Sequence, residues 1–203
     1  MIPAGFRVYL ASRSPRRREL LKQIGIGCEV LLLREHGRRA PDIDESAHPG
    51  ESPDDYVRRV SRAKALAGWL RVEQRKLPRH PVLAADTAVC LEDTLFGKPR
   101  DRHDAARMLA ALSGREHRVL TAVALQSQDR AELALSESLV TFRVLSETEI
   151  RAYLDSGEPM DKAGAYAIQG KAAAFIGMLH GSYSGVMGLP LFETAMLIER
   201  SCA

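Results

Sequence analysis

Two serines and three arginines stand close together near the start of the chain, at Ser12, Ser14 and Arg16–Arg18. Pro15 favours a helix start at this point, and the free backbone N–H groups of a helix N-terminus attract anions. Arginines in the first turn oppose the helix dipole unless a ligand supplies negative charge. The segment therefore indicates a phosphate site. The alternative is a capped helix whose basic first turn is solvated.

A lone carboxylate interrupts the most strand-like apolar run of the chain. Asp86 lies within Pro81–Leu91, whose other residues predict a buried strand. A buried carboxylate is costly unless an ionic partner meets it, so Asp86 indicates a metal ion or a catalytic water. The alternative is an aspartate that caps a turn at the end of the strand. A turn at Glu92–Gly97 would bring Lys98 back beside Asp86, although a single lysine after a turn is usually solvated.

Two other polar segments could bind a ligand. The loop Arg34–Pro53 carries an acidic group, Asp42, Asp44 and Glu45, which is either solvated or shares Mg²⁺ with Asp86. Glu158–Gly170 places charges, a tyrosine and an amide among glycines that let the backbone approach a ligand closely. The alternative for this second segment is a tight turn with an ion pair.

The alternation of expected strands and helices predicts an α/β fold. The expected strands are Phe6–Ala11, Cys28–Leu33, Pro81–Leu91, His117–Gln126, Ala134–Arg143, Tyr166–Gln169 and Ala172–Met178. The expected helices are Arg16–Ile24, Asp54–Arg75, Arg102–Leu112, Glu147–Asp155 and Leu191–Arg200. No repeat or linker interrupts the pattern, so we expect residues 1–203 to form a single domain.

The composition excludes several classes of protein. With 45% apolar and 27% charged residues, the chain is neither disordered nor a coiled coil, and no run is long enough for a membrane helix. Arginines soon after the first short apolar run argue against a signal peptide, so we expect a cytoplasmic protein. Three scattered cysteines indicate neither a disulfide framework nor a zinc site. A net charge of +3 is too small to argue for nucleic acid.

Six motifs in this order resemble the Maf family of nucleotide pyrophosphatases, over Val8–Leu197. Any one of them would be a weak signal, whereas six in order with matching spacing are specific. They are Leu10–Arg17 (LASRSPRR), Ala85–Thr87, Gly97–Pro99, Leu112–Gly114, Asp161–Gly170 and Gly188–Pro190.

The resemblance implies a fold of the Maf/Ham1 type, similar to that of enzymes that remove inosine triphosphate. In that fold helices flank a long mixed sheet, and a central cleft separates two lobes. The resemblance also implies hydrolysis of a nucleoside triphosphate between the α and β phosphates, with Mg²⁺ or, alternatively, Mn²⁺ or Co²⁺. Members are often homodimers, and some are linked to arrest of septum formation. The expected partner is a small nucleotide, with no stable nucleic acid and no membrane.

Three positions separate the substrate subgroups of this family. Arg16, Thr87 and Gln169 resemble the subgroup that cleaves dTTP and UTP, whereas the subgroup for 7-methyl-GTP carries Trp, Gln and Glu there. The amide of Gln169 can match O4 and N3–H of uracil or thymine. Two alternatives remain: 7-methyl-GTP as the substrate, which Gln169 disfavours, and a catalytically idle regulator of cell division, which the retained Asp86 disfavours.

The resemblance also implies roles for single residues. Asp86 matches the family's catalytic proton acceptor, and Glu45 matches an acid that shares the metal with Asp86. The residues that would neutralise charge on the phosphates are Arg17, Lys64 and Lys98. Those that would hydrogen-bond the phosphates are Ser12 and Ser14. Two segments depart from the family pattern: Leu32–Ile43 is longer and rich in arginine, and Ser184-Gly185 replaces a common Ser-Asn pair.

Overall fold

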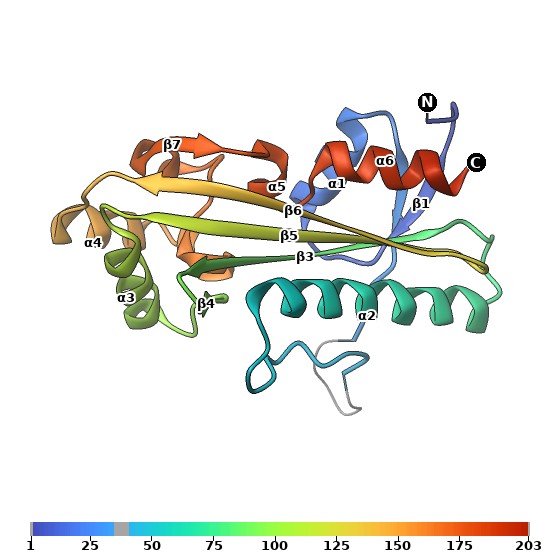
Figure 1. Cartoon of the computed structure of the whole chain (residues 1–203), viewed down its shortest axis with the longest axis horizontal. Helices are drawn as coiled ribbons and strands as arrows, with labels where there is room; N and C mark the ends of the chain where they lie inside the picture. Colours follow the sequence, from blue (N-terminus) through green and yellow to red (C-terminus); the bar gives the residue numbers. More distant parts are fainter. Residues whose placement is uncertain (1, 35–40, 203) are drawn as a thin grey trace.

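The computed structural model describes residues 2–34 and 41–202, and it contains a seven-stranded mixed sheet that is not closed into a barrel (Figure 1). Six strands follow the order β2-β1-β3-β5-β6-β7, and β4 pairs with β3 beside this path. The strands are β1 (Arg7–Leu10), β2 (Gly27–Val30), β3 (Val82–Leu91), β4 (Thr94–Phe96), β5 (Glu116–Gln126), β6 (Ala131–Phe142) and β7 (Ile176–His180).

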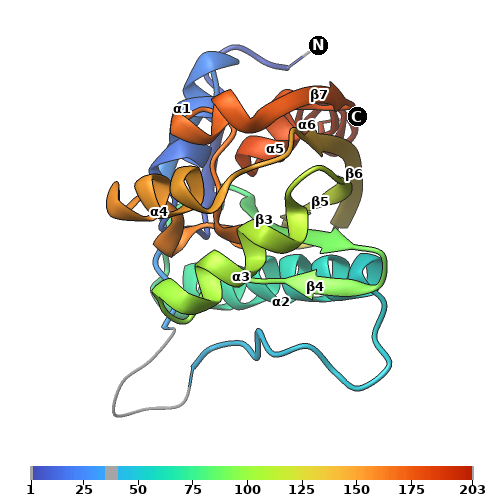
Figure 2. The same ribbon diagram turned by 90° about the vertical axis from the view of Figure 1, so that its left-hand side faces the viewer.

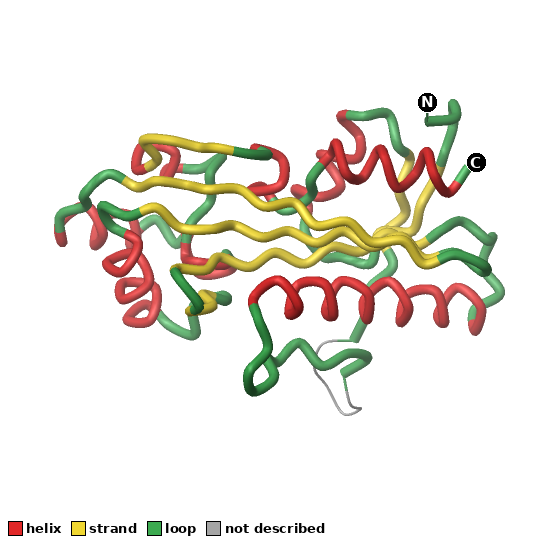
Figure 3. The backbone as a smooth tube through the Cα atoms, in the orientation of Figure 1, coloured by secondary structure: helices red, strands yellow, loops and turns green. Residues whose placement is uncertain are grey.

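Three long strands form the middle of the sheet and run almost the full length of the molecule (Figure 3). These strands, β3, β5 and β6, have 10 to 12 residues each and pair antiparallel, whereas β1 runs parallel to β2 and β3. Every residue of β3 except Thr87 is buried, as its continuous apolar run predicts. The sheet therefore carries Asp86 at its centre.

Helices cover both faces of the sheet, as Figure 2 shows. The longest helix, α2, lies along β3 and β5 on one face, and α1, α5 and α6 lie on the opposite face. Helices α3 and α4 pack together at the far end. Their bounds are α1 (Pro15–Gln23), α2 (Pro53–Gln74), α3 (Arg102–Leu112), α4 (Glu147–Asp155), α5 (Tyr183–Met187) and α6 (Leu191–Ser201).

Most buried apolar side chains gather toward the two ends of the long strands, and a smaller cluster around Val57 and Leu120 packs α2 against β3 and β5. One cluster, around Phe142 and Tyr166, fills the end that carries α3 and α4. Two others, around Leu21 and Trp69, fill the end that carries α1, α2 and α6. The mixed sheet with helices on both faces confirms the predicted α/β fold.

Three local predictions are wrong. Tyr166–Gln169 forms no strand, because the chain turns there after Gly164 and Ala165, which both have positive φ. Ala172–Met178 is mostly a 3-10 helix, η3 (Lys171–Phe175), and only its end joins β7. The turn predicted at Glu92–Gly97 contains β4. Short apolar runs indicate burial, and periodicity alone cannot assign them to a strand or a helix.

None of the helices in the described ranges has the length and apolar character that crossing a bilayer requires.

Candidate active site

A cavity of about 770 Å³ opens between the two ends of the sheet. All ten residues that the sequence analysis assigns to the site line this cavity: Ser12, Ser14, Arg16, Arg17, Glu45, Lys64, Asp86, Thr87, Lys98 and Gln169. Among the described lining residues, six side chains are basic and four are acidic. A concave, positively charged site on the sheet suits a small polyanion.

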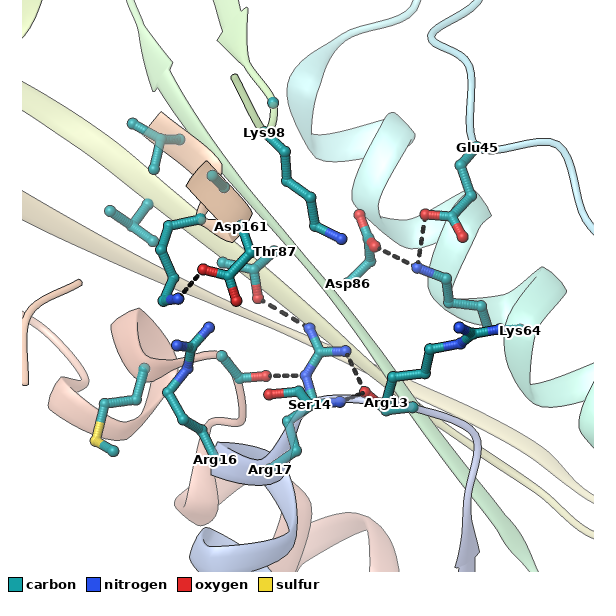
Figure 4. Close-up of a pocket in the computed structure, with 18 of the residues that line it drawn as sticks. Arg13, Ser14, Arg16, Arg17, Glu45, Lys64, Asp86, Thr87, Lys98 and Asp161 are labelled. Atoms are coloured by element: carbon teal, nitrogen blue, oxygen red, sulfur yellow. Dashed lines mark hydrogen bonds and ion pairs between the residues drawn. The ribbon is translucent and has the colours of Figure 1, made fainter. Parts of the chain in front are cut away.

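An ion-paired triad lies at the centre of the cavity (Figure 4). The Lys64 ammonium on α2 donates to Oδ1 of Asp86 at 2.8 Å and to Oε2 of Glu45 at 3.0 Å. The side chains of Lys64 and Asp86 are only 13% and 11% exposed, whereas that of Glu45 is 41% exposed. Lys64 is therefore the ionic partner that the buried Asp86 carboxylate needs. Asp86 does not cap a turn at the end of a strand.

Helix α2 also holds the loop that carries Glu45. Arg59 donates to the backbone carbonyls of Asp44 and Ser46, and Tyr56 donates to that of Glu45 at 3.1 Å. Of the acidic group Asp42, Asp44 and Glu45, only Glu45 pairs with Lys64. The sequence analysis did not single out Arg59, because an arginine on an exposed helix face gives no sign that it binds a loop.

The other two acids of this group, Asp42 and Asp44, pair with residues other than Lys64. Asp44 accepts hydrogen bonds from Ser46, and Asp42 pairs with Arg34 and Arg71. Residues 35–40, which make up half of the Arg-rich segment Leu32–Ile43, lie outside the described ranges.

The N-terminus of α1 is open toward the cavity. Ser14 occupies the N-cap position, but its side chain makes no capping hydrogen bond, and the first turn contains no acid. By contrast, the N-cap side chains of α2, α3 and α4 each accept a backbone N–H. An uncapped and basic helix start therefore faces a cavity, as the phosphate interpretation of this segment requires.

Arg17 ties α1 to the sheet and to α5. Its Nε donates to the carbonyl of Gly188 at 2.7 Å, and its two terminal nitrogens donate to Oγ of Ser12 and Oγ1 of Thr87. Burial lowers the pKa of the Arg17 guanidinium, and the nearby Asp86 carboxylate partly offsets that effect. A guanidinium has five N–H donors, so two remain after these contacts.

Lys98 and Arg16 approach the cavity from opposite sides in Figure 4. Lys98 follows β4, and its ammonium points toward Asp86, as a hairpin through this segment predicts. Arg16 points toward Asp161, which pairs with Lys162. Both Asp161 and Lys162 line the cavity, but the sequence analysis gave neither one a role. Their place inside the Asp161–Gly170 motif was the available signal.

Gln169 reaches the cavity from a turn that a carboxylate holds in place. Glu158 accepts hydrogen bonds from the Tyr153 hydroxyl at 2.8 Å and from the backbone N–H of Lys171 at 3.0 Å. The carboxylate lies so close to Gly170 that a Cβ atom there would overlap it. A side chain at position 170 would therefore displace the Glu158 carboxylate, which binds the turn that directly follows Gln169.

The carboxylate oxygens of the triad show whether a divalent cation fits the cavity. Asp86 and Glu45 present carboxylate oxygens on either side of one ammonium. Mg²⁺ at phosphoryl-transfer sites binds through one or two carboxylates plus substrate phosphates. In residues 2–34 and 41–202 there is no group of three or more His, Cys, Asp or Glu side chains that could hold a metal ion. The residues therefore fit a cation that is bound jointly with a triphosphate.

Comparison with known proteins assigns the chain to a family. A family model described as Maf-like protein matches residues 7–201. A protein of Nitrosomonas europaea named dTTP/UTP pyrophosphatase is 60% identical over 199 residues, covering 98% of this chain and 96% of that protein. Proteins of the same name from Aromatoleum aromaticum and Dechloromonas aromatica are 57% and 55% identical, over 98% and 96% of this chain and 97% and 96% of their own lengths. Since the model and the relatives match nearly the whole chain, the protein belongs to the Maf family.

Proposed function

We propose that this protein is a nucleotide pyrophosphatase that hydrolyses dTTP and UTP to the monophosphate and pyrophosphate. The observation that carries the proposal is the buried pair of Asp86 and Lys64, set beside the uncapped N-terminus of α1. Three relatives that are 55% to 60% identical carry the name dTTP/UTP pyrophosphatase, which supports the same substrates.

In the proposed reaction, a water molecule attacks the α-phosphorus of the nucleotide. The new bond forms between the water oxygen and phosphorus, and the bond from phosphorus to the α–β bridging oxygen breaks. Asp86 accepts the proton of the water, while pyrophosphate leaves with the bridging oxygen. Lys64 holds Asp86 in place through their 2.8 Å contact.

The cationic groups act on the phosphates. Lys98 and the two remaining N–H groups of Arg17 neutralise the charge that grows on the phosphate oxygens in the transition state. Ser12 and Ser14 donate hydrogen bonds to the same oxygens. Asp86 and Glu45 would hold a divalent cation, most simply Mg²⁺, which supplies further charge neutralisation when it is bound with the substrate.

The other end of the cavity recognises the base. Gln169 donates to O4 of uracil or thymine and accepts from N3–H. Cytosine presents an amino group and a bare nitrogen at the same edge, so one amide orientation cannot satisfy both bases. Arg16, at another of the positions that separate the substrate subgroups, completes the selection of the base.

The test is the rate of pyrophosphate release from dTTP, UTP, CTP, ATP, GTP and 7-methyl-GTP, with Mg²⁺ in excess. We expect kcat/KM for dTTP and UTP to exceed that for CTP by about 10- to 100-fold, because a mismatched buried polar pair costs roughly 1–3 kcal/mol. Equal rates on UTP and CTP would contradict base reading by Gln169. A preference for 7-methyl-GTP would contradict the assigned substrates.

We also propose that the chain folds as a single domain, that two copies form a homodimer, and that the protein is cytoplasmic. Limited proteolysis tests the single domain, since one folded unit should resist cleavage throughout residues 41–202. Sedimentation of the purified protein tests the dimer, which should have twice the 22.4 kDa mass of one chain. Cell fractionation tests the location.

A further inference from the structure

A closed ring of hydrogen bonds lies beside the cavity and joins α1, β3, β5 and α5. Arg17 Nη2 contacts Oγ1 of Thr87 at 3.3 Å, Thr87 contacts Oγ1 of Thr121 at 3.0 Å, and Thr121 contacts the carbonyl of Gly185 at 2.8 Å. Gly188 closes the ring, because its carbonyl accepts from Arg17 Nε and its N–H donates to the carbonyl of Gly185. The ring therefore contacts α5 at two points, Gly185 within the helix and Gly188 at its C-cap.

Proton counting fixes the direction of each bond in this ring. A carbonyl has no proton, so the 2.8 Å contact requires the single hydroxyl proton of Thr121 to go to Gly185. The contact between the two threonines must then use the proton of Thr87. Thr87 in turn accepts from the Arg17 guanidinium, which can only donate.

Thr121 is fully buried and does not line the cavity, whereas Thr87 does. The two are direct cross-strand partners in the register of β3 and β5. With its proton committed to Thr121, the Thr87 hydroxyl has no proton left to donate to a base. Its remaining function within the ring is to accept from Arg17.

We propose that Thr121 is a positioning residue for catalysis, which orients the Thr87 hydroxyl so that a lone pair faces Arg17. The ring thereby holds the guanidinium with its two unused N–H groups directed at the phosphates of the substrate. This inference rests on the proposed function and deepens it, because it assigns the Thr87 hydroxyl to the phosphate machinery. The backbone carbonyl of Gly185 is one anchor of the ring, and a side chain there would press on Ser182 and Ser136.

The test begins with Thr121→Val, which keeps the shape of the side chain and removes the hydroxyl. We expect kcat/KM to fall about tenfold for dTTP, UTP and CTP alike, because one buried hydrogen-bond link is lost. The ratio of UTP to CTP should not change. Thr121→Ser, which retains the hydroxyl, should restore most of the activity.

A second variant breaks the adjacent link and covers the case in which Thr121→Val does not fold. Thr87→Val should show the same uniform loss, and the double variant should be no worse than either single one, since both break the same ring. Additive losses would overturn the proposal. A loss confined to one base would also overturn it, because the Thr87 hydroxyl would then read the base.

Binding of inorganic pyrophosphate, measured by calorimetry with excess Mg²⁺, separates this inference from the proposed function. Pyrophosphate has no base, so its dissociation constant should rise by a similar factor in Thr121→Val. A wild-type protein that binds pyrophosphate but cleaves no triphosphate would refute the proposed function alone. Unchanged pyrophosphate binding and turnover in a folded Thr121→Val variant would show that Thr121 acts only on stability, and would overturn the inference.

Discussion

The two ends of the cavity are built in different ways. The phosphate end, Asp86, Lys64 and Glu45, takes two of its three side chains from the longest helix and a central strand. At the base end, Gln169 and Gly170 lie in the turn before η3, and Glu158 begins another 3-10 helix, η1 (Glu158–Asp161). Charge pairing holds the first end, and close packing of a carboxylate on a glycine holds the second.

The residues proposed to carry out hydrolysis therefore lie on other elements than those proposed to select the base. In the proposed function the phosphate end contacts groups that every nucleotide shares, so substitutions there should change all rates together. The base end lies on turns whose shape can change without disturbing the long strands. Variants at the phosphate end should therefore change the rate on every nucleotide, whereas variants at the base end should change the preference among nucleotides.

The largest effect is expected at the phosphate end. Asp86→Asn removes the proton acceptor but is nearly isosteric, so turnover should fall by about 100-fold or more on every nucleotide. The melting temperature should change little by comparison. Asp129→Asn, in the exposed turn between β5 and β6, is the matched control and should keep full activity. An Asp86→Asn variant that retains more than about a tenth of wild-type turnover would refute the catalytic role.

The next largest effect is expected at the base end. Gln169→Glu removes the amide donor and adds a charge, so kcat/KM for dTTP and UTP should fall about 10- to 100-fold. Pyrophosphate binding should stay near the wild-type value. The control is Gln128→Glu, which makes the same chemical change in an exposed turn. Equal losses in pyrophosphate binding and in UTP cleavage would remove the distinction between the two ends.

A smaller effect should follow from disturbing the turn behind Gln169. Gly170→Ala displaces the Glu158 carboxylate from its contacts with Tyr153 and Lys171, so the UTP-to-CTP ratio should fall about tenfold. Gly177→Ala is the matched control, because a Cβ atom there meets only one backbone atom, at 3.9 Å. If Gly170→Ala keeps the wild-type ratio, Glu158 does not position Gln169.

The smallest effect concerns the packing beneath the base end. His117 is buried against Tyr166, with Nε2 and the Tyr166 hydroxyl 2.9 Å apart, and burial lowers the pKa of His117 to about 4. At pH values between about 4 and the ordinary histidine pKa of 6.5, His117 binds more protons in the unfolded chain than in the folded one. Acidification through this range therefore destabilises the fold. Between pH 7 and pH 5.5 the loss should be about 1 kcal/mol.

Urea unfolding at these two pH values measures that loss. His117→Gln cannot titrate, so its free energy of unfolding should depend less on pH than that of the wild type by about the same 1 kcal/mol. An identical pH dependence in both proteins would show that His117 is protonated equally in the folded and unfolded states.

Regular elements could be predicted from the sequence because their signals are local and repeated. The bounds of α3 and α4 match the prediction, and the helix Asp54–Arg75 differs from α2 by one residue at each end. The apolar segment after Gly164 could not be assigned in this way. There, positive φ at Gly164 and Ala165 makes the chain turn, and the side chains are buried without a strand.

The candidate site shows the same contrast. Asp86 was recognisable as a carboxylate in an apolar strand, and the structure places Lys64 against it. Thr121 was not recognisable, because a threonine in an alternating strand is ordinary and only the pairing register shows its partner. The role of Glu158 could not be recognised either, because it depends on how close its carboxylate lies to Gly170 in space. Residues that position others are found from contacts, which a single sequence does not contain.

In the proposed reaction, water attacks the α-phosphorus of UTP. Hydrolysis of UTP in water enriched in oxygen-18, followed by phosphorus NMR of the products, shows which phosphorus is attacked. We expect UMP that carries the heavy oxygen on its phosphate, together with unlabelled pyrophosphate. Label in pyrophosphate, or release of UDP and phosphate, would contradict the proposed reaction.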